Sequence, residues 1–102
     1  MNRGDIYDVV LPGGGRPAVI VTRDVAIPLL RNVCVAAVTS RARGIRTEVP
    51  VGPAQGLRRE CVVSCDNLFT MPKAALGERR GSIGADLRPR LDDALRVALD
   101  LD

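Results

Sequence analysis

The segment LPGGGRPAVIVTRD, residues 11–24, places three consecutive glycines between two apolar runs. A glycine-rich loop that holds the phosphates of a dinucleotide must open a helix, because the helix N-terminus supplies the N–H groups and the favourable dipole. Here the glycines lead instead into Arg16-Pro17 and the β-branched run Val19–Val21, and no Gly-Lys-Ser/Thr follows. The segment therefore predicts a β-hairpin with its turn at Pro12–Gly15, which places Arg16 at the mouth of the hairpin.

Further short strand-like runs lie on both sides of this hairpin. Asp24–Leu30 has room for one helical turn, interrupted by Pro28, and Pro50 favours an edge position for its strand. The predicted strands are Gly4–Leu11, Arg16–Arg23, Asn32–Ser40, Thr47–Val51, Cys61–Asn67 and Gly81–Gly84.

The periodicity changes to that of a helix near the C-terminus. From Asp86 onward, apolar residues recur at spacings of three and four, with Asp86 as a candidate cap and Pro89 in the first turn. The expected fold is mainly β with a C-terminal helix, in one domain spanning residues 1–102. Closely spaced strands favour a small antiparallel barrel or strongly coiled sheet.

Charge and composition favour a polyanionic partner without proving one. The net charge is +3, and Lys73 is the only lysine among 15 basic residues. Arginine can bind phosphate oxygens through two parallel hydrogen bonds. An arginine preference imposed by a GC-rich genome remains an equal alternative.

Several chemistries are excluded or disfavoured by the residue types present. There is no histidine, which rules out histidine-based acid–base catalysis and histidine metal ligands. The three cysteines, Cys34, Cys61 and Cys65, fit small buried residues in a reducing compartment better than a disulfide framework or a zinc site. No apolar run approaches the length of a membrane span, and the N-terminus has no signal-like apolar region, so we expect a soluble, cytoplasmic protein.

A series of motifs along the whole chain resembles the MazF/PemK-type toxins of bacterial toxin–antitoxin pairs. Each motif is weak alone, but their order and spacing together are specific. They are RGDIYDVVLP, GRPAVIVTRD, VAAVTS, CVVSCDNLFTMPKAALGERRGSIG and LDDALRVALDL.

The resemblance implies a small SH3-like antiparallel barrel that forms a homodimer and cleaves single-stranded RNA at short sequence motifs, with no metal and no cofactor. It also implies a cognate antitoxin protein that lays a largely disordered segment across the dimer. Metal-independent cleavage uses the neighbouring 2′-OH as nucleophile, leaving 2′,3′-cyclic phosphate and 5′-OH ends.

Carried over by motif, the resemblance gives catalytic roles to Arg16, Thr39 and Asp66. Arg16 would clamp the scissile phosphate, Thr39 would donate a hydrogen bond to it, and Asp66 would accept or orient the 2′-OH proton. Asp66 could instead simply cap a turn with Asn67, and Thr39 could tie down the loop that follows it. The candidate RNA-binding residues are Ser40, Arg41, Arg43, Arg46, Asn67, Phe69 and Thr70; for Phe69 a core or dimer-interface position is an equal alternative to base stacking.

Three departures from the family pattern bear on the proton acceptor and on the RNA sequence preference. Ser64 stands where the PemK branch has a basic residue, Phe69-Thr70 replaces the common Arg-Thr, and the first hairpin is short. Two other function classes therefore stay open: a catalytically inactive RNA- or antitoxin-binding module of the same fold, and a CcdB-like gyrase inhibitor, which has fold-level support only.

Overall fold

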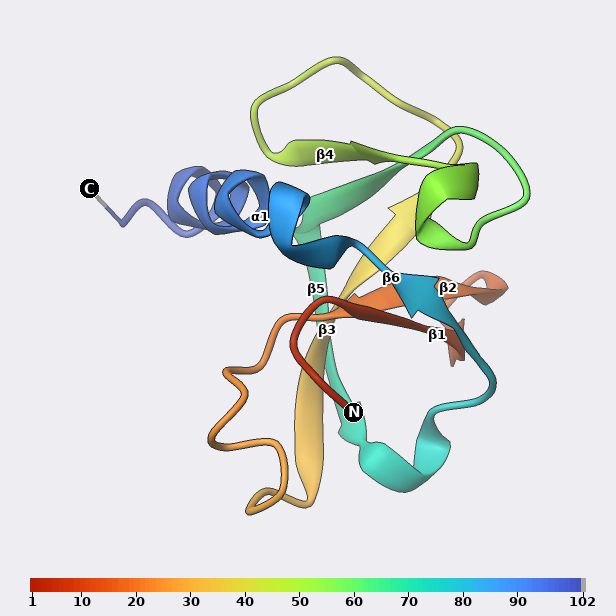
Figure 1. Cartoon of the computed structure of the whole chain (residues 1–102), viewed down its shortest axis with the longest axis vertical. Coiled ribbons are helices and arrows are strands. Elements are labelled where there is room, and N and C mark those ends of the chain that lie inside the picture. Colours follow the sequence, from red (N-terminus) through yellow and green to blue (C-terminus); the bar gives the residue numbers. More distant parts are fainter. Residues whose placement is uncertain (102) are drawn as a thin grey trace.

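The protein forms one curled, fully antiparallel sheet of six strands with a single helix packed against it (Figure 1), in a computed structural model that describes residues 1–101. The spatial order of the strands is β4-β5-β3-β2-β1-β6. Their bounds are β1 Asp5–Leu11, β2 Gly14–Ile20, β3 Asn32–Thr39, β4 Glu48–Val51, β5 Cys61–Pro72 and β6 Arg79–Ser82, with short 3₁₀ turns η1 Pro53–Gln55 and η2 Lys73–Ala75 and helix α1 Gly84–Ala98. The expected class, mainly β with a C-terminal helix, is confirmed.

The glycine-rich segment forms the predicted hairpin, with a tighter turn than expected. Leu11 pairs with Gly14, so only Pro12 and Gly13 lie between β1 and β2. Gly13 has a φ of +98°, and a proline followed by a glycine with positive φ is the pattern of a type II turn. The turn therefore begins β2 two residues before the predicted start at Arg16.

The two edges of the sheet approach each other next to η1, which gives the sheet its barrel-like shape. Strand β4 leads directly into η1, and the backbone of Gln55 and Gly56 lies against the backbone of Arg80 and Gly81 in β6. A Cβ atom on Gly56 or Gly81 would overlap the opposing carbonyl oxygen, so only glycine permits this approach. The expectation that β4 is an edge strand is confirmed.

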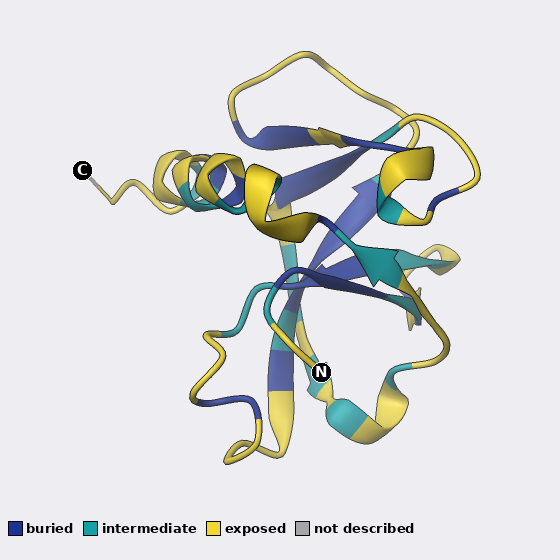
Figure 2. Cartoon of the chain, viewed as in Figure 1, coloured by how far each residue is buried: buried dark blue, intermediate teal, exposed yellow. Residues whose placement is uncertain are grey.

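Apolar residues from both faces of the sheet build two clusters. Figure 2 colours the buried residues dark blue, and most of them lie on the strands. Helix α1 covers one face, where Leu91 and Ala94 are buried and Leu87, Leu95 and Ala98 are partly buried. The apolar stripe of the helix is thus used within its own chain. Among residues 1–101, no helix has both the length and the apolarity needed to cross a membrane.

Several other predictions about the elements were wrong. Helix α1 begins at Gly84, where φ is +77°, so Asp86 lies inside the first turn and makes no side-chain cap, and Pro89 falls in the second turn. Strand β6 begins at Arg79, and β2 ends at Ile20. Residues 24–30 form turns without a helix, and β5 continues to Pro72 because its far half pairs with the first half of β3.

Candidate functional site

The candidate site lies where β2 and β3 stop pairing. Arg16 and Thr39 each lie two residues beyond Ala18–Ala37, the last pair between these strands, at equivalent positions of the antiparallel register. Side chains alternate along a strand, and both residues therefore project from the same face of the sheet. Both line a cavity of about 950 Å³.

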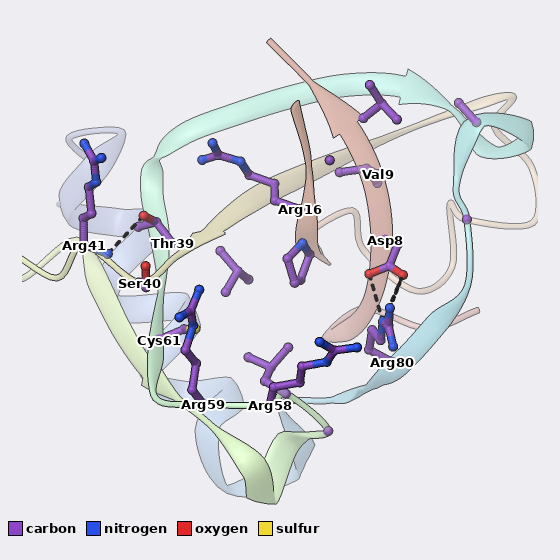
Figure 3. Close-up of a pocket in the computed structure, with 18 residues that line it drawn as sticks. Asp8, Val9, Arg16, Thr39, Ser40, Arg41, Arg58, Arg59, Cys61 and Arg80 are labelled. Atoms are coloured by element: carbon purple, nitrogen blue, oxygen red, sulfur yellow. Dashed lines mark hydrogen bonds and ion pairs between the residues drawn. The ribbon is translucent and has the colours of Figure 1, made fainter. Parts of the chain in front are cut away.

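The buried part of Arg16 carries an unused hydrogen-bond donor. Within residues 1–101, Arg16 Nε is the one buried side-chain nitrogen or oxygen that has no hydrogen-bond partner. Leaving a buried donor unsatisfied costs about 1–3 kcal/mol, and more for a charged group. The guanidinium extends into the cavity (Figure 3), so an acceptor entering there would remove that cost.

The Thr39 hydroxyl oxygen is held by one hydrogen bond at the last position of β3. Oγ1 accepts a hydrogen bond of 3.2 Å from the backbone N–H of Arg41. This contact is the one that the structural alternative for Thr39 predicts. Because Oγ1 serves as the acceptor, the hydroxyl hydrogen stays available to donate to a group in the cavity.

The basic loop 41–46 is held from beneath by a buried carboxylate. Glu48 is 6% exposed and accepts hydrogen bonds from the backbone N–H groups of Arg43 at 3.0 Å and Gly44 at 2.9 Å. This contact turns the loop so that Ser40 and Arg41 line the cavity, whereas Arg43 and Arg46 do not.

Asp66 lies away from Arg16 and Thr39. Thr39 pairs with Val62 on β5, and four residues at about 3.3 Å each separate Asp66 from that pair along the strand. Asp66 does not line the cavity, and its Oδ2 accepts a 2.6 Å hydrogen bond from Thr47 Oγ1. The structure therefore does not bring the three expected catalytic side chains together.

Asp66 also lies within a bulge in β5. Ala36 pairs with Leu68, while the next residue, Ala37, pairs with Ser64, so residues 65–67 have no partners on β3. Within the bulge, Asn67 Nδ2 donates to Ser64 Oγ at 2.8 Å.

The remaining expected RNA-binding residues also lie outside the cavity. Phe69 is partly buried against the second apolar cluster, so of its two expected roles the structure favours the packing one. Thr70 is exposed beside Cys34 in a separate, shallower groove.

Sequence reasoning missed the opposite wall of the cavity. Arg58, Arg59 and Arg80 line it together with Cys61, and Asp8 is its single carboxylate. Asp8 is occupied by Arg80, whose Nε lies 2.9 Å and Nη2 2.7 Å from Oδ2. These hydrogen bonds raise the pKa of Arg80 above its usual value, so its charge is fixed. The only signal in the sequence was the Arg58-Arg59 doublet, which lies in the loop between η1 and β5 and comes to face Arg16 only when the sheet closes beside η1.

The expectation of buried cysteines is confirmed for Cys65, whereas Cys34 and Cys61 are only partly buried. Cys65 is buried and Cys61 is partly buried in the same apolar cluster beneath α1, and all three cysteines are free thiols. Burial, followed by the nearby charge of Asp66, raises the pKa of Cys65 to about 11.

Comparisons with known proteins agree with this geometry along most of the chain. Residues 2–99 match the family described as PemK-like, MazF-like toxins of type II toxin–antitoxin systems. Endoribonuclease MazF3 of Mycobacterium tuberculosis is 47% identical over 87 residues, which cover 85% of this chain and 84% of that protein. Probable endoribonuclease MazF5 of the same species is 39% identical, over 85% of this chain and 81% of its own.

Solved structures give the same result for the fold. The M. tuberculosis toxin MazF-mt6 superposes with a TM-score of 0.90 at 44% identity, covering 96% of this chain and 98% of its own. A mycobacterial endoribonuclease solved in complex with its cognate antitoxin also superposes with a TM-score of 0.90, at 29% identity. The match covers 100% of this chain and 97% of that one. The chain belongs to the PemK-like, MazF-like toxin family of type II toxin–antitoxin systems.

Proposed function

We propose that this chain is the endoribonuclease toxin of its toxin–antitoxin pair, and that it cleaves single-stranded RNA at the Arg16–Thr39 end of the cavity. The observation that carries the proposal is the buried, unpartnered Arg16 Nε, on a side chain that extends into an arginine-lined cavity. The relatives named as endoribonucleases support the reaction class.

The proposed reaction needs no metal ion. The 2′-oxygen of the nucleotide before the scissile phosphate attacks phosphorus and loses its proton, and the bond from phosphorus to the 5′-oxygen breaks. The departing 5′-oxygen takes up a proton, which gives a 2′,3′-cyclic phosphate and a 5′-OH end. The demanding step is the build-up of negative charge on the phosphoryl oxygens.

Arg16 and Thr39 suit the stabilisation of that charge. The Arg16 guanidinium stays protonated throughout and offers several N–H donors in one plane. Thr39 supplies a hydroxyl that the N–H of Arg41 already orients. Preorganised donors of this kind are each worth about 10²–10³ in rate.

The proposal leaves Asp66 outside the reaction. The Asp66 carboxylate is bound to Thr47 and lies some four residues of strand away from the Thr39 pair. Proton transfer requires the base within hydrogen-bond reach of the 2′-OH, or one water away from it.

The proposed partners are single-stranded RNA, the cognate antitoxin and a second copy of the chain, all in the cytoplasm. Val25 and Leu29, in the segment between β2 and β3, are 74% and 84% exposed, and neighbouring exposed apolar side chains are common at protein interfaces. We expect light scattering to give a dimer mass for the parent chain and a monomer mass for Leu29→Asp. If Leu29→Asp forms a dimer of unchanged stability, the interface does not include this segment.

The first experiment is cleavage of mixed-sequence RNA in the presence of EDTA, with 5′-OH ends mapped by sequencing. We expect cuts at one recurring short motif for the parent chain and none for Arg16→Ala. Arg90→Ala, which removes an exposed arginine of α1, is the matched control and should cut like the parent. A folded parent chain that binds RNA without cutting it would instead establish the inactive binding module.

A further inference from the structure

The wall of the cavity that faces Arg16 carries two neighbouring arginines. Figure 3 shows Arg58 and Arg59 rising from the same segment and diverging. Arg59 extends toward Ser40 and Cys61, and Arg58 extends toward Arg80. The two guanidinium groups therefore cover different parts of the same cavity.

The segment that presents them is rigidly held. Leu57 is buried, and its N–H donates to the carbonyl oxygen of Gly52 at 3.3 Å. Gly56, with a φ of +97°, packs its backbone against that of Arg80, where no Cβ atom fits. Arg58 and Arg59 thus directly follow two residues that are packed in place, which lowers the entropy lost when they bind a ligand.

The charge of the cavity is not neutralised within the chain. Across residues 1–101, Arg80 is the one cavity arginine that forms an ion pair, and its partner is Asp8. Five arginines and one carboxylate give the lining a formal excess of four positive charges, while the whole chain carries +3. The remainder of the molecule is therefore slightly negative. Like charges gathered in one concavity repel one another, and a polyanion relieves that repulsion.

The volume of the cavity exceeds what a single phosphate requires. About 950 Å³ lies at the upper end of the range for sites that bind drug-sized ligands, roughly 300–1,000 Å³. Arg16 and Thr39 occupy one end, and the Arg58–Arg59 wall occupies another.

We propose that Arg58 and Arg59 bind the phosphates that flank the scissile phosphate, so that the cavity holds a continuous stretch of RNA backbone. The inference rests on the proposed function of the same site. Arg58 and Arg59 are binding residues here, without contact to the reacting atoms, so their loss should raise KM and leave kcat nearly unchanged.

The test neutralises the RNA phosphates one at a time and measures how strongly the protein binds each RNA. An RNA with 2′-O-methyl groups throughout, which blocks cleavage, carries one uncharged methylphosphonate at each position in turn. For the parent chain we expect binding to weaken roughly tenfold at the scissile phosphate and at its neighbours. In Arg58→Ala/Arg59→Ala, a methylphosphonate at a phosphate next to the scissile one should no longer weaken binding, because the arginines that bind those phosphates have been removed.

The salt dependence gives a second, independent reading. Each phosphate contact to single-stranded RNA contributes about 0.7 to the slope of log K against log salt, so the double variant should lose about 1.4. Arg90→Ala/Arg96→Ala removes the same charge from exposed positions on α1 and should leave the slope and the methylphosphonate sensitivity unchanged.

Two results would overturn the inference. One is a double variant that keeps the full methylphosphonate sensitivity of the parent. The other is unchanged RNA binding together with weakened binding of an acidic antitoxin segment, which would assign Arg58 and Arg59 to a protein interface. A parent chain that binds this RNA as expected but fails to cut unmodified RNA would refute the endoribonuclease proposal alone.

Discussion

Arg16 and Thr39, which are 23 residues apart in the sequence, each lie two residues beyond the last pair between β2 and β3, Ala18–Ala37, and line the same cavity. Each residue has a hydrogen-bond donor available for a ligand. Arg16 retains a buried donor without a partner, and the Thr39 hydroxyl accepts one hydrogen bond from Arg41 and keeps its hydrogen free to donate. A phosphate between them would be contacted from two strands at once.

This arrangement predicts that the two residues act as a unit. Arg16→Ala and Thr39→Val should each lower kcat/KM by about 10²–10³, and the double variant should lose clearly less than the product of the two. Thr39→Ser, which keeps the hydroxyl, should stay within about tenfold of the parent. Single-turnover cleavage of a mapped oligonucleotide measures all four chains.

The same variants separate catalysis from folding. Arg16→Ala should unfold at the same temperature as the parent or at a higher one, because it removes a buried donor that has no partner. A large drop in Tm for Arg16→Ala would show that the arginine is structural, and the catalytic assignment would then fail.

The position of Asp66 predicts that its carboxylate is dispensable for cleavage. Asp66→Asn should cleave within about threefold of the parent and should lose about 1 kcal/mol of stability through the weakened Thr47 contact. Chemical denaturation and single-turnover kinetics test the two parts separately. A hundredfold loss of cleavage at unchanged stability would restore Asp66 as the proton acceptor.

Asp8→Asn offers a contrasting carboxylate variant. Its oxygens hold Arg80, so the substitution should free that guanidinium for RNA. We expect tighter RNA binding and a salt slope steeper by about 0.7. An unchanged slope would mean that Arg80 takes no part in RNA binding.

Thiol labelling offers a footprint of the cavity. Cys61 lines the cavity and is partly exposed, whereas Cys65 is buried and keeps its proton at pH 8 because its pKa is about 11. Iodoacetamide should therefore modify Cys61 much faster than Cys65, and uncleavable RNA should protect Cys61. Cys34, which lies in the other groove, is the internal control that RNA should leave unprotected.

The raised pKa of Cys65 also predicts a loss of stability at high pH. The unfolded chain would ionise this thiol near its ordinary value of 9.0, but the folded chain holds the proton until about 11. The contribution to folding is complete below about pH 9 and declines as the pH rises from there toward 11. Cys65→Ala should show a weaker decline over that interval, measured by denaturation at fixed pH.

The buried carboxylate under loop 41–46 predicts a coupled loss of stability and activity. Glu48→Ala removes the acceptor for the N–H groups of Arg43 and Gly44 and should cost about 2 kcal/mol, or roughly 10 °C in Tm. RNA cleavage should fall as well, because Arg41 loses its fixed position. Glu60→Ala makes the same charge change at an exposed site and should change neither property.

The amino-acid sequence determined the local elements and part of the site. Pro12-Gly13 closes a hairpin because glycine tolerates positive φ, the β-branched run forms β2, and the spacing of Leu91 and Ala94 marks the buried face of α1. These features depend on neighbours within a few residues. The same local signals identified Arg16 and Thr39 as residues at strand ends, and motif resemblance assigned them their chemistry.

Only the tertiary structure decided which charged side chains share the cavity. The closing of the sheet beside η1 brings Arg58, Arg59 and Arg80 to face Arg16, although as many as 64 positions separate them in the sequence. Asp66 lies four residues along β5 from the residue that pairs with Thr39, in a bulge at residues 65–67 whose size follows from the pairing of β3 with both halves of β5. Such pairings depend on contacts between distant segments, so no local pattern encodes them.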